Sequence, residues 1–252
     1  MSHAVTPASH RTYRYLGPIF AHFVDVQVEG EENLPAEGGF VLAPNHISNL
    51  DPVGIWYAMV SHGYQVRMMA KKEMLDIPVV GAWFASIGLV PVDRGSHPGA
   101  SLEIAAQLLA DGQCVGLYPE GTLTAEPGYW PMRAKTGAAR LALDTHAPII
   151  PVAQWGMQDV MPRYSLRVSL RSHQPSRVRI LPAVDLSDLY SERGSQDHGA
   201  VEEATGRIFR AITAGVEALR GGTAPETPFD PRTSRGAKPA KKDRDRGGRA
   251  TS

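Results

Sequence analysis

Short apolar runs alternate with longer amphipathic stretches between residues 40 and 156. The runs are typical of strands covered on both faces, and the stretches have the spacing of helices. This alternation predicts an α/β fold, a single-domain sandwich in which a mixed, partly parallel sheet is flanked by helices. We expect strands at Phe40–Ala43, Val66–Ala70, Leu89–Val92, Cys114–Tyr118 and Ile149–Ala153, and helices at Pro52–Val60, Ala100–Ala110 and Thr136–Asp144.

The segments on either side of this region have different patterns. Residues 1–12 are expected to be flexible, whereas residues 13–28 carry apolar side chains at i, i+3 and i+4, which predicts an amphipathic helix. That helix either packs on the core or lies in a lipid interface. Beyond these, Leu166–Leu170 and Val178–Leu181 are expected to form an edge hairpin, and Val201–Leu219 a closing helix.

The last part of the chain, residues 221–252, is rich in Pro, Gly, Lys and Arg and is expected to be a disordered basic tail. The predicted domain is therefore 13–220, with its motifs in 40–156. Net charge is zero and the basic stretch 232–252 of the tail lacks interleaved aromatics, which argues against nucleic-acid binding. No stretch reaches the ~18 apolar residues of a spanning helix, so we expect any membrane contact to be peripheral.

The first candidate for chemistry is the segment 45–52, Asn-His-Ile-Ser-Asn-Leu-Asp-Pro, between an expected strand and an expected helix. Five positions along a helix correspond to a rotation of ~500°, so His46 and Asp51 converge only if His46 lies in the turn before the helix. Asp51 could then cap the helix and hold one imidazole nitrogen, which leaves the other to act as a base. A turn histidine followed by an unrelated capping aspartate has the same spacing, so both interpretations stay open.

Other polar side chains follow the expected strands. The segment 118–124, Tyr-Pro-Glu-Gly-Thr-Leu-Thr, interrupts a strand and could bind a polar head group, or could be a solvated loop. Arg94 and Lys72 also come just after strands. The planar fork of arginine suits phosphate, although ordinary surface ion pairs would explain both cations as well. Residues 154–156 end another strand and could line a pocket.

The order of the segments carries more information than any one of them. The Asn-His segment is followed by Gly-Leu-Val-Pro-Val-Asp-Arg-Gly at 88–95, by Pro-Glu-Gly-Thr at 119–122 and by Pro-Ile-Ile-Pro-Val-Ala at 148–153. In this order they resemble the glycerolipid acyltransferase family, whose members include 1-acylglycerol-3-phosphate acyltransferases. The resemblance runs from about residue 40 to about residue 156, under half of the chain.

The resemblance implies the glycerolipid acyltransferase fold and transfer of a fatty acyl group from acyl-CoA or acyl carrier protein to a lysophospholipid hydroxyl, most simply that of 1-acylglycerol-3-phosphate. No metal and no cofactor besides this acyl donor is implied. The enzyme would work peripherally at the cytoplasmic face of the cell membrane. His46 would be the general base and Asp51 its orienting partner. The implied substrate-binding residues are Arg94 for the acceptor phosphate, Lys72 as a second cation, and Glu120, Gly121 and Thr122 around the acceptor.

One position departs from the family pattern. Many members have arginine after Glu-Gly-Thr, where it helps to bind the phosphate, but this chain has Leu123. Arg94, Lys72, Arg133 or Lys135 would have to supply the charge instead. The acceptor could therefore be another phospholipid or a glycolipid, and a non-catalytic protein that binds lipid phosphate is a further alternative.

Replacing Arg94 by alanine should raise the KM for the acceptor more than the KM for the donor, because the implied contact is with the acceptor phosphate. Steady-state kinetics in which each substrate is varied in turn measure both constants. Equal losses for the two substrates would instead indicate a structural role for Arg94.

Overall fold

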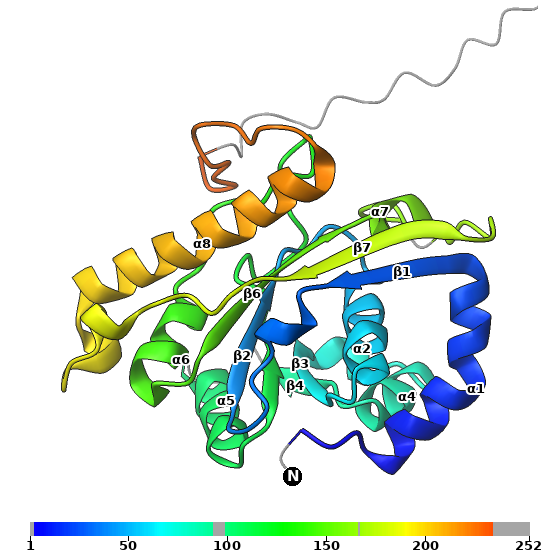
Figure 1. Ribbon diagram of the computed structural model, residues 1–252, viewed down its shortest axis with the longest axis horizontal. Helices are drawn as coiled ribbons and strands as arrows, with labels where there is room; N and C mark the ends of the chain where they lie inside the picture. Colours follow the sequence, from blue (N-terminus) through cyan, green and yellow to red (C-terminus); the bar gives the residue numbers. More distant parts are fainter. Residues whose placement is uncertain (1–2, 93–98, 166, 234–252) are drawn as a thin grey trace, which may run out of the picture.

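The structure, a computed structural model, describes residues 3–92, 99–165 and 167–233 (Figure 1). Its strands are β1 (Val24–Glu29), β2 (Phe40–Pro44), β3 (Val66–Lys71), β4 (Val90–Val92), β5 (Cys114–Gly116), β6 (Ile149–Trp155) and β7 (Gln174–Ile180). Its α-helices are α1 (Pro7–Phe23), α2 (Asp51–Ser61), α3 (Lys72–Leu75), α4 (Val80–Ser86), α5 (Ala100–Ala110), α6 (Gly137–Thr145), α7 (Met157–Val160) and α8 (His198–Arg220). Short 3-10 helices occupy Glu31–Asn33, Ser187–Leu189 and Gly194–Gln196.

The strands form one sheet in the order β1-β7-β6-β2-β5-β3-β4. From β6 to β4 all neighbours are parallel, whereas β7 runs antiparallel to β6 and parallel to β1. The prediction of a mixed, partly parallel sheet flanked by helices is therefore confirmed. Because parallel strands end at the same edge of a sheet, the segments that follow β2, β3, β5 and β6 gather at one edge.

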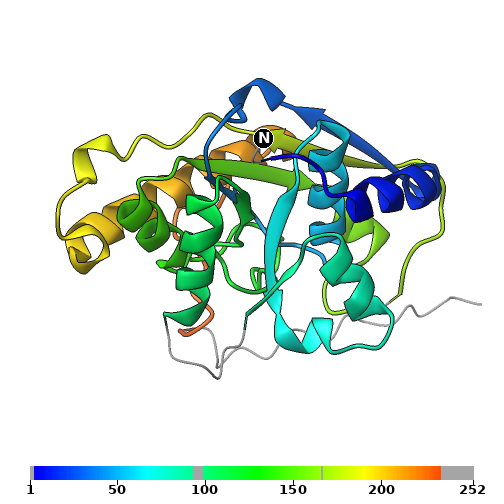
Figure 2. The same ribbon diagram turned by 90° about the horizontal axis from the view of Figure 1, so that it is seen from below.

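The central strand β2 shows why much of the fold can be found from the pattern. Its residues 40–43 have no exposed surface. Phe40 and Leu42 pack in the cluster that includes α2, while Val41 and Ala43 pack in the cluster that includes α5, α6 and α8. Figures 1 and 2 show these two groups of helices on opposite sides of the strands. Burial on both faces makes the strand a continuous apolar run.

The N-terminal segment differs from our expectation. Helix α1 begins at Pro7, inside the segment expected to be flexible, because the Thr6 hydroxyl accepts a hydrogen bond from Ser9 N at 3.2 Å and caps the helix. The helix ends at Phe23, and residues 24–29 form the edge strand β1 rather than its last turns. Three valines alternate with polar residues in that strand, a two-residue period that the neighbouring helical pattern hid.

The expected edge hairpin near residue 170 is wrong. Leu166 lies outside the described residues, and residues 167–170 form no strand. Strand β7 begins at Gln174 and lies between β6 and β1, so β1 rather than a hairpin forms that edge of the sheet. Only alternate side chains of β7, from Ser176 to Ile180, are buried, and such a half-buried strand gives a weaker apolar signal than a central one.

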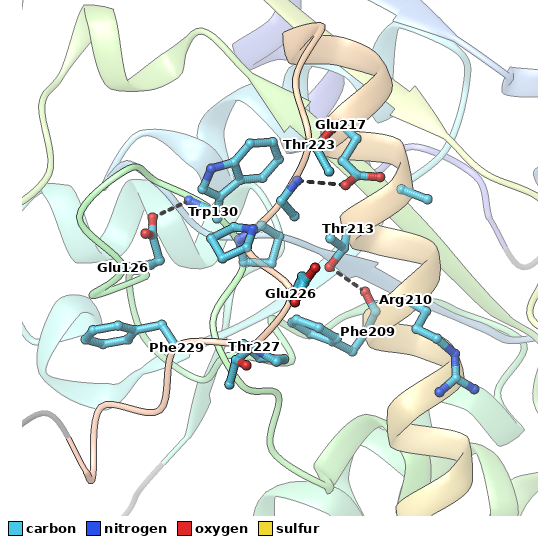
Figure 3. Close-up of a pocket in the computed structure, with 15 residues that line it drawn as sticks. Glu126, Trp130, Phe209, Arg210, Thr213, Glu217, Thr223, Glu226, Thr227 and Phe229 are labelled. Carbon is cyan, nitrogen blue, oxygen red and sulfur yellow. Dashed lines mark hydrogen bonds between the residues drawn. The ribbon is translucent and has the colours of Figure 1, made fainter.

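Residues 222–233, part of the tail expected to be disordered, return along α8. Ala224 N donates to Glu217 Oε1 at 2.7 Å, and a cavity of about 400 Å³ lies between α8, this segment and the loop around Trp130 (Figure 3). Phe209 and Phe229 contribute aromatic walls to the cavity. The rest of the expected tail, from residue 234, lies outside the described residues. Among the helices described, none is long and apolar enough to cross a membrane.

Two glycines of α8 should respond to substitution by alanine with opposite signs. At Gly206 a Cβ would meet only the flexible end of Arg210, at 3.2 Å, so the gain in helix propensity should stabilise the fold by about 0.5–1 kcal/mol. At Gly215 a Cβ would lie 2.8 Å from Ala153 Cβ on β6, and this overpacking should cost about 1–3 kcal/mol. Urea unfolding of G206A and G215A measures both effects. A stabilised G215A protein would contradict the close packing of α8 on the sheet.

Candidate active site

The turn between β2 and α2 carries the first candidate pair. His46 Nδ1 lies 2.9 Å from Asp51 Oδ2. The same oxygen accepts hydrogen bonds from Ile47 N at 2.6 Å and Ser48 N at 2.8 Å. Asp51 is the first residue of α2. We expected it to cap this helix, but its carboxylate instead accepts hydrogen bonds from the amides of the preceding turn. One carboxylate thus fixes both the turn and the imidazole within it.

The two members of this pair lie in different environments. The side chain of Asp51 has no exposed surface, whereas that of His46 is 15% exposed. Burial raises the pKa of the Asp51 carboxyl, and the contacts with His46 and with the amides of Ser48 and Ile47 act in the opposite direction. The imidazole therefore reaches the surface with the carboxyl group behind it, which is the arrangement of a base and its orienting partner.

The ring of Tyr118 packs against one face of the His46 ring. The two rings are stacked, with centroids 3.9 Å apart and planes at 16°. Tyr118 lies two residues beyond β5, the parallel neighbour of β2. Burial raises the pKa of this phenol well above its ordinary value. Sequence reasoning missed Tyr118, although its place at a strand end, directly before Pro-Glu-Gly-Thr, was a usable signal.

Glu120 joins the loop after β5 to the turn after β2. Its Oε1 accepts from His46 N at 2.9 Å, and its Oε2 accepts from Met132 N at 3.0 Å. A further backbone bond runs from Thr124 N to His46 O at 2.7 Å. Glu120 is only 3% exposed, so its carboxyl group faces backbone amides rather than an incoming substrate. Burial raises the pKa of Glu120 to about 8.

A reciprocal amide pair ties the turn to β6. Asn45 Nδ2 donates to Gln154 O at 3.1 Å, and Gln154 N donates to Asn45 Oδ1 at 2.8 Å. Gln154 Nε2 then donates to Asn45 O at 2.6 Å. Both residues are 1% exposed. We had expected the stretch 154–156 to line a pocket, but Gln154 instead anchors the residue before His46.

The remaining predicted residues have different placements. Gly121 adopts φ +68°, a conformation that favours glycine, and Thr122 beside it is exposed. Lys72 is exposed at the start of α3, directly after β3 and therefore at the same edge of the sheet as His46. Arg94 lies outside the described residues, so its position relative to the histidine stays a prediction.

The hydroxyl of Ser48 is held within the turn. Its Oγ donates to Met161 O at 2.8 Å and accepts from Leu50 N at 3.1 Å. The side chain is fully buried. These contacts give Ser48 a structural function in the turn, so His46 is the group of this segment that is available for proton transfer.

The raised pKa of Glu120 predicts how stability depends on pH. In the unfolded chain this group loses its proton near pH 4.5, but in the folded protein only near pH 8, so the folded state holds one more proton between these values. Stability should therefore fall as pH rises through this range, with a slope that approaches about 1.4 kcal/mol per pH unit for this group. Urea unfolding of the wild type and of E120Q at several pH values measures the slopes. The slope should be shallower in E120Q, and parallel curves would contradict the raised pKa.

Comparison with known proteins gives one consistent family. A family model described as Acyltransferase matches residues 25–155. A 1-acyl-sn-glycerol-3-phosphate acyltransferase of Bacillus subtilis (strain 168) is 35% identical over 131 residues, 52% of this chain and 63% of the relative. A 1-acyl-sn-glycerol-3-phosphate acyltransferase alpha of Mus musculus is 28% identical over 214 residues, 83% of this chain and 71% of the relative.

A solved structure has a similar fold. It is the 1-acyl-sn-glycerophosphate (LPA) acyltransferase PlsC from Thermotoga maritima, with a TM-score of 0.62 and 22% identity, and the match covers 86% of this chain and 80% of that one. The match to the Bacillus subtilis relative spans less than two thirds of its length. The family model, in contrast, spans the turn of His46, the loop of Glu120 and strand β6. The chain belongs to the acyltransferase family.

Proposed function

We propose that this protein transfers a fatty acyl group from acyl-CoA or acyl carrier protein to the free hydroxyl of a lysophospholipid, with 1-acylglycerol-3-phosphate as the first candidate. The contact of 2.9 Å between His46 and the buried Asp51 carries this proposal. The names of the Bacillus subtilis and Mus musculus relatives support this choice of acceptor.

In the proposed reaction His46 acts as general base. With Asp51 ionised, Nδ1 of the imidazole carries a proton and Nε2 can accept one. Nε2 takes the proton of the acceptor hydroxyl while its oxygen attacks the thioester carbonyl. The C–S bond then breaks, the ester C–O bond remains, and the imidazolium returns its proton to the departing thiolate. General-base action of this kind typically contributes about 10²–10⁴-fold to the rate.

The surroundings of His46 support the same role. The Asp51 carboxylate stabilises the imidazolium that forms during the reaction. The stacked ring of Tyr118 and the bond from His46 N to Glu120 limit the movement of the side chain and of the backbone. Because both substrates must meet within a few tenths of an ångström of a productive geometry, such fixed positioning favours catalysis. We assign Asp51, Tyr118 and Glu120 to positioning in this mechanism.

We also propose that α1 contacts the surface of the membrane that holds the acceptor, on its cytoplasmic face. One side of α1 packs on α2, where Tyr13 and Phe20 lie 5.1 and 5.0 Å from the ring of Tyr57. The other side exposes Leu16 by 46% and Ile19 by 57%. Both interpretations of the expected helix therefore have support, since a helix that lies in a lipid interface needs such an exposed apolar side.

Replacing His46 by alanine should reduce acyl transfer by at least about 10²-fold while the protein remains folded. The reason is that the base is removed, whereas Asp51 keeps its bonds to the amides of Ile47 and Ser48. The measurement is mass spectrometry of the lipids formed from acyl-CoA and a panel of lysophospholipids. Circular dichroism checks the fold of the variant.

A matched control is His198→Ala, which removes an exposed histidine at the start of α8. This variant should keep the wild-type rate. Full transfer by the His46 variant would overturn the general-base assignment. Release of free fatty acid by the wild type, with no acylated lipid in the presence of acceptor, would identify a thioesterase instead.

A further inference from the structure

The residue after Glu-Gly-Thr cannot bind the phosphate of an acceptor in this chain. Leu123 has an apolar side chain and is only 7% exposed. Arg133, ten residues further on, forms an ion pair with Asp230 of the C-terminal segment, with Nη1 3.0 Å from Oδ2. A contact from this loop to an acceptor phosphate therefore needs another cation.

Lys135 is held against this loop. Its backbone N donates to Pro119 O at 2.8 Å, so residue 135 lies beside the Pro-Glu-Gly turn. A Cβ on Gly121 would lie 2.8 Å from Lys135 Nζ and 3.0 Å from its Cδ and Cε. The lysine side chain therefore lies directly on Gly121, where any side chain would displace it. The absence of a side chain at position 121 brings the ammonium group onto the turn.

The turn against which Lys135 lies is also hydrogen-bonded to the backbone of His46. Glu120, the residue before Gly121, accepts the hydrogen bond from His46 N at 2.9 Å. Lys72, the other described cation from our sequence analysis, follows β3, which is separated from β2 by β5. Lys135 is thus attached to the loop that contacts His46, whereas Lys72 belongs to a more distant strand of the sheet.

We propose that Lys135 binds the phosphate of the acceptor and thereby selects a phosphorylated lysolipid over its unphosphorylated counterpart. This inference rests on the proposed transferase function. The exposed ammonium group can approach an incoming phosphate, and the packing of its alkyl chain on Gly121 restricts the otherwise flexible side chain. Gly121 and Lys135 together would take the place of the arginine found in many members of the family.

The test compares two acceptors that differ only in the phosphate, 1-acylglycerol-3-phosphate and the 1-acylglycerol with the same acyl chain. With acyl-CoA as donor, kcat and KM are measured for the full-length wild type, K135A and K135R. We expect K135A to raise the KM for the phosphorylated acceptor by about tenfold or more, because a charge-assisted contact is lost. The constants for the unphosphorylated acceptor should change little, and K135R should keep most of the preference.

Arg140→Ala is the matched control, since it removes an exposed cation on α6 a few residues away. It should leave the preference between the two acceptors unchanged. Equal losses of K135A for both acceptors, or no loss for either, would overturn the assignment of Lys135 alone. If the wild type acylates neither acceptor, 1-acylglycerol-3-phosphate is not its acceptor, and this inference fails with that choice.

Discussion

The site depends on one buried carboxylate oxygen. Asp51 Oδ2 contacts His46 Nδ1, Ile47 N and Ser48 N at distances of 2.6–2.9 Å. A carboxyl group without exposed surface is costly unless it is hydrogen-bonded, and these three partners offset part of that cost, although burial still raises the pKa of Asp51. Because all three belong to one short turn, the same bonds that make the burial tolerable also set the orientation of the imidazole. A change that removes the Asp51 carboxylate would therefore affect both the stability of the turn and the orientation of the His46 imidazole.

A second buried carboxyl group holds the same histidine from its backbone. Glu120 connects His46 N with Met132 N, so the loop after β5 and the turn after β2 cannot move independently. The inward direction of Glu120 changes the interpretation of the Glu-Gly-Thr motif. The family resemblance implied that this residue shapes the acceptor side of the site, whereas its contacts favour the positioning of His46. The neighbouring Gly121 lies against the side chain of Lys135 instead, so adjacent residues of the motif have different contacts.

The C-terminal part of the chain supports this loop from outside. The guanidinium of Arg220, at the end of α8, lies 3.8 Å from the ring centroid of Trp130 and 4.3 Å from that of Trp155. Arg133 N donates to Phe229 O at 2.9 Å. Helix α8 and the segment after it thus contact the stretch that contains Met132 and Lys135. The cavity of Figure 3 lies between α8, the segment after it and the loop around Trp130, and His46 is not among its lining residues.

By itself the sequence determined the α/β class and the central strands, and it offered the pairing of His46 with Asp51 as one of two interpretations, the one that the family resemblance implied. Central strands are covered on both faces and give unbroken apolar runs, and the pair is local, five residues apart. Only the tertiary structure decided the edge strand β1, the inward direction of Glu120 and the placement of Lys135 on Gly121. Half-exposed strands have mixed patterns, and Glu120 meets His46 across 74 positions of the chain. The local spacing of residues does not predict such contacts, because they form only when separate strands become neighbours in the sheet.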